Sequence, residues 1–341
     1  MKIFYTPAHL AHAPALEFES GRLVPIPEVP ARVESVRAEI EERKLGIISA
    51  PADFGMEPVL RVHDAAFVEF LSRAHEDWLA CYGTDAPDAI PSAWPVRGMR
   101  RNLSGDIEGR LGSYAADTAT PITRGTWSAA LTAANIALSG AQSIIAGERA
   151  AFGLCRPPGH HASAEVFGGY CYLNNAAIAA QWLTDRGLRA AILDVDYHHG
   201  NGTQAIFYDR ADVLYCSLHA DPAFAFPHFA GFADEHGAGH GEGANMNLPL
   251  PAGTAWSSYA PALDAALARI GQSGPDVLVV SLGLDTFEGD PICNFQLRSE
   301  DYLRMGGAIA RLRIPTLFLF EGGYDLASLG QNTANVLAGF L

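Results

Sequence analysis

Two short segments carry residues whose types and spacing could perform metal-dependent hydrolysis. The segment Asp194–Gly200 reads DVDYHHG and follows an apolar run. Side chains at alternate positions of a strand share one face, so Asp196 and His198 could bind one metal ion with Asp194 behind them as a hydrogen-bond acceptor. The alternative is a structural network of aspartate and histidine hydrogen bonds at the end of a strand.

A third ligand is offered by Asp285, which ends the run Ser281–Asp285 (SLGLD). Two carboxylates and one imidazole suit a catalytic zinc site, because catalytic zinc keeps three protein ligands and one open position. Asp285 could instead cap the N-terminus of a helix. The residues two positions after His198 and Asp285 are Gly200 and Phe287, which cannot bind a metal, so the pattern favours one metal ion over two.

Two further segments could supply acid, base and oxyanion chemistry. Arg156–His161 (RPPGHH) places two histidines on a turn that two prolines and a glycine restrict, although a structural histidine pair is the alternative. Glu321–Tyr324 (EGGY) could bring a tyrosine hydroxyl to a developing oxyanion, because glycine allows the backbone to approach closely. Tyr170 and Phe226 could line a tunnel for a methylene chain, although core packing is the commoner explanation for such aromatics.

Alternating strands and helices predict an α/β fold around these residues. Continuous apolar runs indicate strands buried on both faces, and hence a parallel sheet with helices between its strands. Several strands lead into turns that hold the candidate residues, and ligands of such sheets lie beyond the carboxyl ends of the strands. The predicted strands are Met1–Phe4, Ala150–Leu154, Ala191–Val195, Val213–Leu218, Val277–Leu282 and Pro315–Phe320; the predicted helices are Trp127–Ala146, Asn174–Arg186, Ser257–Ile270, Ser299–Leu312 and Leu329–Phe340.

Composition narrows the class of protein. The chain has 341 residues and a formal net charge of −15, enough length for one large α/β domain or two smaller ones. The acidic balance argues against nucleic acid and anionic membranes as partners and would attract a cationic substrate, although it can also serve solubility alone. No apolar run is long enough for a membrane span, and no signal peptide is expected. Five scattered cysteines without a C-x-x-C pair favour the reducing cytoplasm.

The stretch Cys81–Thr120 departs from the alternation. It is rich in proline, glycine, arginine and aspartate and has weak periodicity, so it predicts an excursion too long for an ordinary connection. It contains Tyr82, Trp94 and Tyr114, which we expect to be exposed and to contact a partner surface.

In their order along the chain, the motifs RPPGHH, DxDxHHG, GxD and GGY resemble those of the histone deacetylase and acetylpolyamine amidohydrolase superfamily. The resemblance covers nearly the whole chain and implies an arginase-like α/β fold. That fold has a mostly parallel central sheet, helices on both faces, and a single domain, residues 1–341, with an insertion at 81–120. The excursion and the segments Phe167–Cys171 (FGGYC) and Asp285–Pro291 (DTFEGDP) are most similar to the bacterial acetylpolyamine branch.

The resemblance implies roles position by position. His161 matches the general base and acid, His160 its partner histidine, and Tyr324 the tyrosine that polarises the amide carbonyl. Asp194 matches the acceptor behind His160. Where the family often has an aspartate behind the second histidine, this chain has Asn201, which should let His161 lose its proton more readily. The implied ligands of zinc, or of Fe²⁺ or Co²⁺ in its place, are Asp196, His198 and Asp285; those of a structural potassium ion are Asp194, Asp196, His198, Ser217 and Leu218.

The resemblance also implies how substrate is selected. Glu17 matches an acidic residue at the tunnel mouth in the polyamine branch, and Glu108 and Asp117 of the excursion could also meet ammonium groups. Eukaryotic polyamine deacetylases carry a glutamate directly after Gly-Asp-Pro, where this chain has Ile292, so the preferred amine stays open. The tunnel aromatics of the family are matched by Tyr170 and Phe226.

Together these expectations describe a zinc-dependent amidohydrolase that removes acetyl groups from acetylated polyamines or small diamines and releases acetate and the free amine. The resembling enzymes use the excursion to form a two-fold dimer, so we expect a homodimer in which one chain's loop borders the site of the other. Three alternatives remain open: a deacetylase of acetyl-lysine or other amides, a two-metal ureohydrolase, and an inactive amine sensor.

Overall fold

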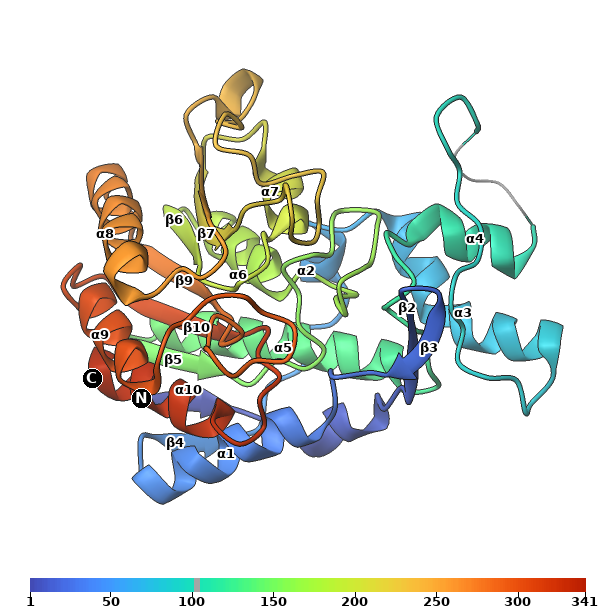
Figure 1. Cartoon of the computed structure of the whole chain (residues 1–341), viewed down its shortest axis with the longest axis horizontal. Helices are drawn as coiled ribbons and strands as arrows, with labels where there is room; N and C mark the ends of the chain where they lie inside the picture. Colours follow the sequence, from blue (N-terminus) through green and yellow to red (C-terminus); the bar gives the residue numbers. More distant parts are fainter. Residues whose placement is uncertain (101–104) are drawn as a thin grey trace.

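An eight-stranded parallel sheet forms the centre of the molecule, which is a computed structural model that describes residues 1–100 and 105–341 (Figure 1). All neighbouring strands run parallel. In spatial order the strands are β4 (Ile47–Ser49), β1 (Lys2–Phe4), β5 (Ala150–Gly153), β10 (Thr316–Phe320), β9 (Val277–Leu282), β6 (Ala190–Asp194), β7 (Val213–Ala220) and β8 (Asn245–Leu250).

The sheet is buried on both faces because its central strands are apolar at most positions. In β9, Val277 and Val279 join one hydrophobic core, whereas Leu278 and Val280 join the other. Alternate residues of a strand point to opposite faces, so a continuous apolar run serves two helical layers at once. The first layer contains α2 (Glu57–Leu60), α3 (Ala65–Tyr82), α4 (Ile107–Tyr114), α5 (Thr126–Ile145), α6 (Asn175–Thr184) and α7 (Asn201–Phe207); the second contains α1 (Ala31–Arg43), α8 (Trp256–Ser273), α9 (Ser299–Ala310) and α10 (Leu329–Phe340).

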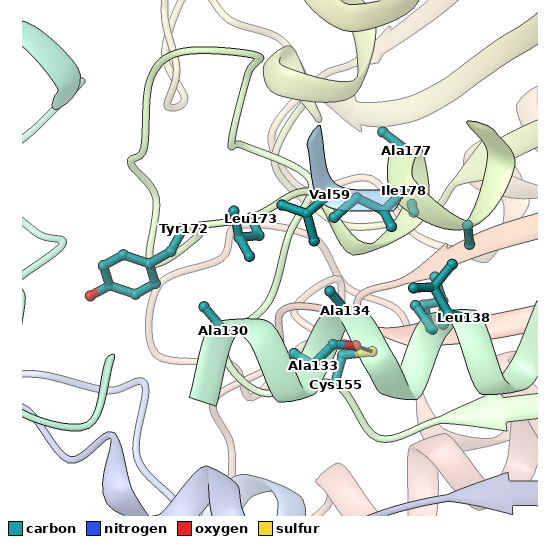
Figure 2. Packing of buried hydrophobic residues seen from close by; sticks show 14 of the residues in the cluster. Val59, Ala130, Ala133, Ala134, Leu138, Cys155, Tyr172, Leu173, Ala177 and Ile178 are labelled. Carbon is teal, nitrogen blue, oxygen red and sulfur yellow. Dashed lines mark hydrogen bonds between the residues drawn. The ribbon is translucent and has the colours of Figure 1, made fainter. Parts of the chain in front are cut away.

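Small side chains let α5 and α6 pack closely in the first layer. Figure 2 shows Ala130 and Ala134 of α5 on the side that faces Ile178 of α6, whereas Ala133 lies beside Cys155. An alanine-rich face brings two helix backbones near each other and leaves little void between them. This packing fixes α6 behind the turn that carries the histidine pair.

The sequence predicts the central elements well. All six strands and five helices expected from the apolar patterns are present, with ends that differ by a few residues. The start of α6 shows why one boundary shifts: Asn174 is the N-cap, and its Oδ1 accepts a hydrogen bond of 2.9 Å from the amide of Ala177. The mostly parallel, single-domain α/β fold is therefore confirmed.

The sequence patterns did not predict the short and peripheral strands and helices. Three-residue β4 and half-buried β8 lack a long apolar run, and the antiparallel hairpin of β2 (Leu16–Glu19) and β3 (Arg22–Pro25) lies outside the main sheet. Helix α4 interrupts the excursion after its N-cap Asp106, although two glycines weaken its helical pattern. Such elements depend on tertiary contacts more than on their own periodicity.

The expectation of three exposed aromatic residues in the excursion is wrong for two of them. Trp94 is half-buried and its indole N–H donates to the carbonyl of Ala115 at 2.9 Å. Tyr114 is half-buried and stacks on Phe70 with ring centroids 4.7 Å apart. Only Tyr82 is exposed, because the other two rings find partners in their own chain.

Two observations bear on the compartment. All five cysteines are unpaired. Among the residues described, no helix combines the length and the apolar character that crossing a membrane requires.

The contact between α9 and α10 gives a test of the packing. A Cβ at Gly306 would lie 2.0 Å from the carbonyl oxygen of Val336, whereas a Cβ at the adjacent Gly307 would lie 3.7 Å from its nearest neighbour, Gly339 O. We expect Gly306→Ala to lower the free energy of unfolding by about 1–3 kcal/mol through overpacking. Gly307→Ala should cost nothing and could add up to ~1 kcal/mol, because alanine favours helix. Urea unfolding followed by circular dichroism measures both, and equal effects would contradict the close approach.

Candidate active site

Four consecutive strands of the sheet bring the candidate residues to one edge. β5, β10, β9 and β6 are spatial neighbours. The segments that follow them hold, respectively, the histidine pair, Tyr324, Asp285, and the run Asp194–His198. Because parallel strands end at the same edge of a sheet, segments far apart in sequence converge there.

Asp196, His198 and Asp285 form a compact group of potential metal ligands. Their donor atoms all lie within 4.8 Å of one another, and His198 Nδ1 lies 3.3 Å from Asp196 Oδ1 and 3.0 Å from Asp285 Oδ2. A Cβ at Gly322 would lie 2.5 Å from Asp196 Oδ2 and 2.6 Å from Asp285 Oδ2, so only glycine leaves room for both carboxylates. Two carboxylates and one imidazole, with no further ligand from Gly200, fit a site for one zinc-type ion with an open position.

Backbone amides orient the two carboxylates of this group. Asp196 Oδ2 accepts from the amide of Gly322 at 2.8 Å, and Asp285 Oδ1 accepts from the amide of Tyr197 at 2.9 Å. Burial raises the pKa of Asp285 to about 7, and the negative charge of Asp196 adds to that effect. Burial opposes ionisation of Asp196 too, but the charge of His160 and the hydrogen bond from His198 hold its pKa well below the usual range. The chain thus concentrates negative charge at one buried point.

The two histidines of the RPPGHH turn are held in different environments. His160 Nδ1 lies 3.1 Å from Asp194 Oδ2, and His161 Nδ1 lies 2.7 Å from Asn201 Oδ1. An amide oxygen can only accept, so His161 must carry its proton on Nδ1, which leaves the lone pair of Nε2 free. Burial, together with the positive charges of His160 and His198, lowers the pKa of His161 well below its usual value. For His160 the charges of Asp196 and Asp194 outweigh burial and raise the pKa to about 10. A base and an acid therefore stand side by side, with ring centroids 4.0 Å apart.

Tyr324 and His161 face a common cavity of about 300 Å³. Tyr324 is almost fully buried, and burial raises the pKa of its hydroxyl well above 10, so the hydroxyl remains a proton donor. The Phe226 ring contacts His161 edge-on at 4.9 Å, and the Tyr170 ring lies 5.8 Å from that of Tyr324. The cavity is lined by Glu17, Glu19, Asp117, Ala119, His161, Gly169, Tyr170, Tyr197, His198, Phe224, Ala225, Phe226, Ile292, Asn294 and Tyr324.

Of the six expected substrate residues, Tyr170 and Phe226 line the cavity, and the other four fall in different places. Glu17 lies in the cavity wall with 3% of its surface exposed, and its Oε2 has no hydrogen-bond partner. Burial raises the pKa of Glu17 to about 7 in spite of a hydrogen bond with Tyr170. Ile292 lines the cavity and is 37% exposed. The cavity wall therefore combines a buried carboxylate, one oxygen of which has no hydrogen-bond partner, with an apolar residue.

The two acidic residues of the excursion that were expected to meet ammonium groups have other contacts in this chain. Asp117 lines the cavity, but its Oδ2 accepts from the amide of Gly169 at 2.6 Å and its Oδ1 accepts from Ala119 and Thr120. Glu108 lies outside this cavity, on α4, where it accepts a hydrogen bond from the hydroxyl of Tyr82. Asp117 therefore holds the Gly169 turn, and the structure does not bring Glu108 to the site of its own chain.

Of the residues expected to bind potassium, Asp196 and His198 belong to the metal-ligand group, and Asp194, Ser217 and Leu218 lie on β6 and β7. Ser217 stands beside Asp194 in the register of β6 and β7, and its Oγ lies 2.7 Å from His219 Nδ1. Both carboxylate oxygens of Asp194 already form hydrogen bonds. Oδ1 accepts from the amide of Asp196, and Oδ2 contacts His160 Nδ1 and accepts from the Tyr215 hydroxyl. Any cation bound here would thus rely largely on carbonyl oxygens.

Sequence reasoning missed a buried ion cluster that supports the site. Glu28 Oε1 accepts hydrogen bonds of 2.8 Å from both Arg32 and Arg156, and all three side chains are buried. Arg32 also donates to the carbonyls of Glu321 at 2.5 Å and Gly323 at 2.6 Å. The cluster joins the start of the RPPGHH turn to the EGGY turn. The one sequence signal for this cluster was Arg156, the first residue of the RPPGHH motif. An arginine buried at that position needs an acidic partner, because an unpaired arginine is rarely buried.

Glu321 is a second residue that sequence reasoning left without a role. Its Oε2 accepts from the amides of Gly159 and His160, at 2.6 and 3.2 Å, and its Oε1 accepts from Ser281 Oγ at 3.2 Å. Donor atoms of Glu321, His160 and Cys171 also lie within 4.8 Å of one another. Both carboxylate oxygens of Glu321 accept hydrogen bonds. Glu321 therefore supports the backbone of the turn that carries the histidine pair.

Comparison with known proteins identifies the class to which this fold and site belong. The profile of the histone deacetylase domain matches residues 26–340, and the chain belongs to that family. It is 52% identical to acetylpolyamine amidohydrolase 2 of Pseudomonas aeruginosa over 100% of this chain and 98% of that protein. It is 48% identical to the acetylpolyamine amidohydrolase of Mycoplana ramosa over 99% of each chain. The crystal structure of acetylpolyamine aminohydrolase from Burkholderia pseudomallei superposes with a TM-score of 0.95 at 40% identity, covering 100% of this chain and 98% of that one. The resemblance predicted from the motifs is confirmed.

The ion cluster generates a prediction about stability. Glu28→Ala leaves two buried arginines without their carboxylate, so we expect the free energy of unfolding to fall by about 3–5 kcal/mol. The control is Glu39→Ala, which removes an exposed partner of Arg43 on α1 and should cost less than about 1 kcal/mol. Denaturant unfolding at neutral pH compares the two, and similar losses would show that the cluster is not a special support.

The same cluster predicts an acid limit to stability. Burial opposes ionisation of Glu28, but Arg156 and Arg32 lower its pKa from 4.5 to about 2. A depressed folded-state pKa means that this contribution is present above pH 4.5 and is lost as pH falls towards 2. The difference in stability between wild type and Glu28→Ala should therefore shrink over that interval.

Proposed function

We propose that the chain hydrolyses the acetyl amide of a small cationic amine, an acetylated polyamine or diamine, and releases acetate and the free amine. The observation that carries the proposal is the shared cavity. Its wall holds His198, which belongs to the group of potential metal ligands, and the base His161. It also holds the neutral hydroxyl of Tyr324 and the buried carboxylate of Glu17. The names of the relatives from Pseudomonas aeruginosa and Mycoplana ramosa support the same substrate class.

We assign zinc to the Asp196, His198 and Asp285 group, with Fe²⁺ or Co²⁺ as substitutes. We assign a structural potassium ion to Asp194, Asp196, His198, Ser217 and Leu218. When bound, zinc polarises the scissile carbonyl and activates water for attack. His161 Nε2 takes the proton from the attacking water because its lone pair is free. Tyr324 donates its hydroxyl hydrogen to the developing oxyanion, and the amine nitrogen receives a proton from the histidine pair as the C–N bond breaks.

The group of potential metal ligands, Asp196, His198 and Asp285, also helps to distinguish the alternative functions. A two-metal ureohydrolase needs further carboxylates near the first group, and the residues at the two tested positions are Gly200 and Phe287. An inactive amine sensor would not need the base, the acid and the oxyanion donor together. A deacetylase of acetyl-lysine proteins would use the same chemistry, so the substrate comparison below separates it.

We further propose a homodimer, in the cytoplasm, that forms through the excursion. Exposed apolar side chains gather on the excursion and on the segments around the cavity. Tyr82, Val96 and Met99 of the excursion are exposed, and so are Phe18 of the hairpin and Phe224 and Phe229 of the loop that carries Phe226. Exposed aromatic and apolar residues near a site are typical of an interface.

The metal assignment predicts loss of activity on chelation. Asp285→Ala removes one of two carboxylate ligands, so we expect bound metal to fall from one ion per chain and turnover to be lost. Asp264→Ala, which changes an exposed carboxylate on α8, should keep both. Metal analysis and an acetate-release assay measure the result, and full turnover by metal-free enzyme would refute the mechanism.

The substrate assignment predicts a charge-selective role for Glu17. For a monoacetylated diamine, Glu17→Gln should raise KM about tenfold or more, since a hydrogen bond to a charged group is worth about 1.5–3 kcal/mol. For a neutral acetamide of equal length it should change KM little. Glu19→Gln is the matched control, because Glu19 lines the same cavity but is exposed. Equal effects on both substrates would remove Glu17 as the ammonium partner, and a preference for acetyl-lysine peptides would favour the alternative deacetylase.

The dimer predicts an effect of surface substitutions in the excursion. Deleting Tyr82–Gly112 would also remove Ile107 and Leu111 from the core, so point changes make a cleaner test. Val96→Asp with Met99→Asp should yield a monomer and admit larger acetyl-lysine peptides. Leu303→Asp on α9, at the opposite end of the molecule in Figure 1, is the control. Sedimentation velocity decides, and an unchanged dimer with unchanged selectivity would count against this interface.

A further inference from the structure

We propose that Asp290 is a positioning residue that sets the oxyanion donor Tyr324 and ties it to the mouth of the cavity. Asp290 is buried, with 7% of its surface exposed. Its Oδ2 accepts from the amide of Tyr324 at 2.7 Å, and its Oδ1 accepts from the amide of Ile292 at 3.1 Å. The reaction in which it is tested rests on the proposed function.

The peptide group between Gly323 and Tyr324 is held from both sides. Arg32 Nε donates to the carbonyl oxygen of Gly323 at 2.6 Å, while Asp290 accepts from the N–H of the same peptide. A planar peptide fixed at both its oxygen and its hydrogen cannot rotate. Its plane sets the direction in which the Tyr324 side chain leaves the backbone, and Gly323, with φ of +116°, would otherwise leave this turn free.

The ring of Tyr324 receives further support from Arg32. The guanidinium lies 4.6 Å from the ring centroid, so one arginine both holds the backbone and packs on the ring. Asp290 acts on the opposite group of the peptide. The two charges flank the turn, and loss of either should let the hydroxyl drift from its working position.

The second hydrogen bond of Asp290, from the amide of Ile292, connects the oxyanion donor with the cavity wall that contacts the substrate. Ile292 lines the cavity and stands where eukaryotic polyamine deacetylases, which the sequence resembles, carry a glutamate. Because one carboxylate holds the amides of both Ile292 and Tyr324, the mouth residue and the oxyanion donor share one support. Asparagine could not replace aspartate fully, since it has one acceptor oxygen for two N–H donors.

A double-mutant cycle tests this role. Asp290→Asn should lower kcat by on the order of 10–10², as small misplacements of catalytic groups do, with KM for the acetylated amine nearly unchanged. Tyr324→Phe alone should lower kcat by on the order of 10²–10³. In the Tyr324→Phe background Asp290→Asn should have less than about a twofold further effect, because no hydroxyl remains to be placed. An equal loss in both backgrounds would reduce Asp290 to a general structural role and overturn the proposal.

Two additions keep the test independent of folding and of the substrate. Glu288→Gln, a charge-matched change at an exposed residue of the same segment, should leave kcat unchanged. Hydrogen exchange of the Gly322–Leu326 peptide should accelerate in Asp290→Asn and not in Glu288→Gln, and equal protection in both would also refute the role. If Asp290→Asn does not fold, Asp290→Glu, which displaces the carboxylate by one methylene, enters the same cycle. If wild type cleaves only acetyl-lysine peptides, the proposed substrate fails while the cycle is still measured with those peptides.

Discussion

A single carboxylate, that of Glu28, holds together the two turns on which the site depends. It lies on neither turn, yet through Arg156 it fixes the head of the RPPGHH segment and through Arg32 it reaches the EGGY segment. Buried charge of this kind is costly unless every donor and acceptor is satisfied. Arg156 also donates to the carbonyls of His9 and His12, and Arg32 to those of Glu321 and Gly323, whereas Glu28 Oε2 has no hydrogen-bond partner. The cluster therefore links the turn that carries the histidine pair to the turn that carries Tyr324.

The central strands divide the work of the site among their carboxyl ends. β6 and β9 lead to carboxylates and an imidazole that can hold a metal, β5 leads to the histidine pair, and β10 leads to Tyr324. Backbone amides of one segment orient the carboxylates of another, as Gly322 does for Asp196 and Tyr197 does for Asp285. The site is therefore rigid because it is cross-linked between strands, and rigid placement is what acid–base and oxyanion chemistry need.

Much of the cavity wall comes from elements outside the sheet. The hairpin supplies Glu17, the excursion supplies Asp117 and its turn contacts, and the loop around Phe226 supplies aromatic walls. Loops can change without disturbing the core, so a family can keep one reaction and vary the amine it accepts. In this chain the buried Glu17, which lacks a partner for one oxygen, stands in the same cavity as the apolar Ile292.

The sequence by itself determined the parallel sheet and its flanking helices, and its motifs singled out the candidate site residues. An apolar run such as Val277–Val280 can be buried only between two layers. The expectation that Asp196 and His198 continue the strand is wrong, because β6 ends at Asp194 and both residues lie in the loop that follows it. Only the tertiary structure showed that Glu28, Arg32, Asp290 and Glu321 form hydrogen bonds with the turns that carry the candidate residues, that Trp94 and Tyr114 are half-buried, and that Glu108 lies outside the cavity of its own chain. Such roles depend on which long-range partner meets each polar side chain. Local periodicity reports the face that a residue occupies and carries no information about that partner.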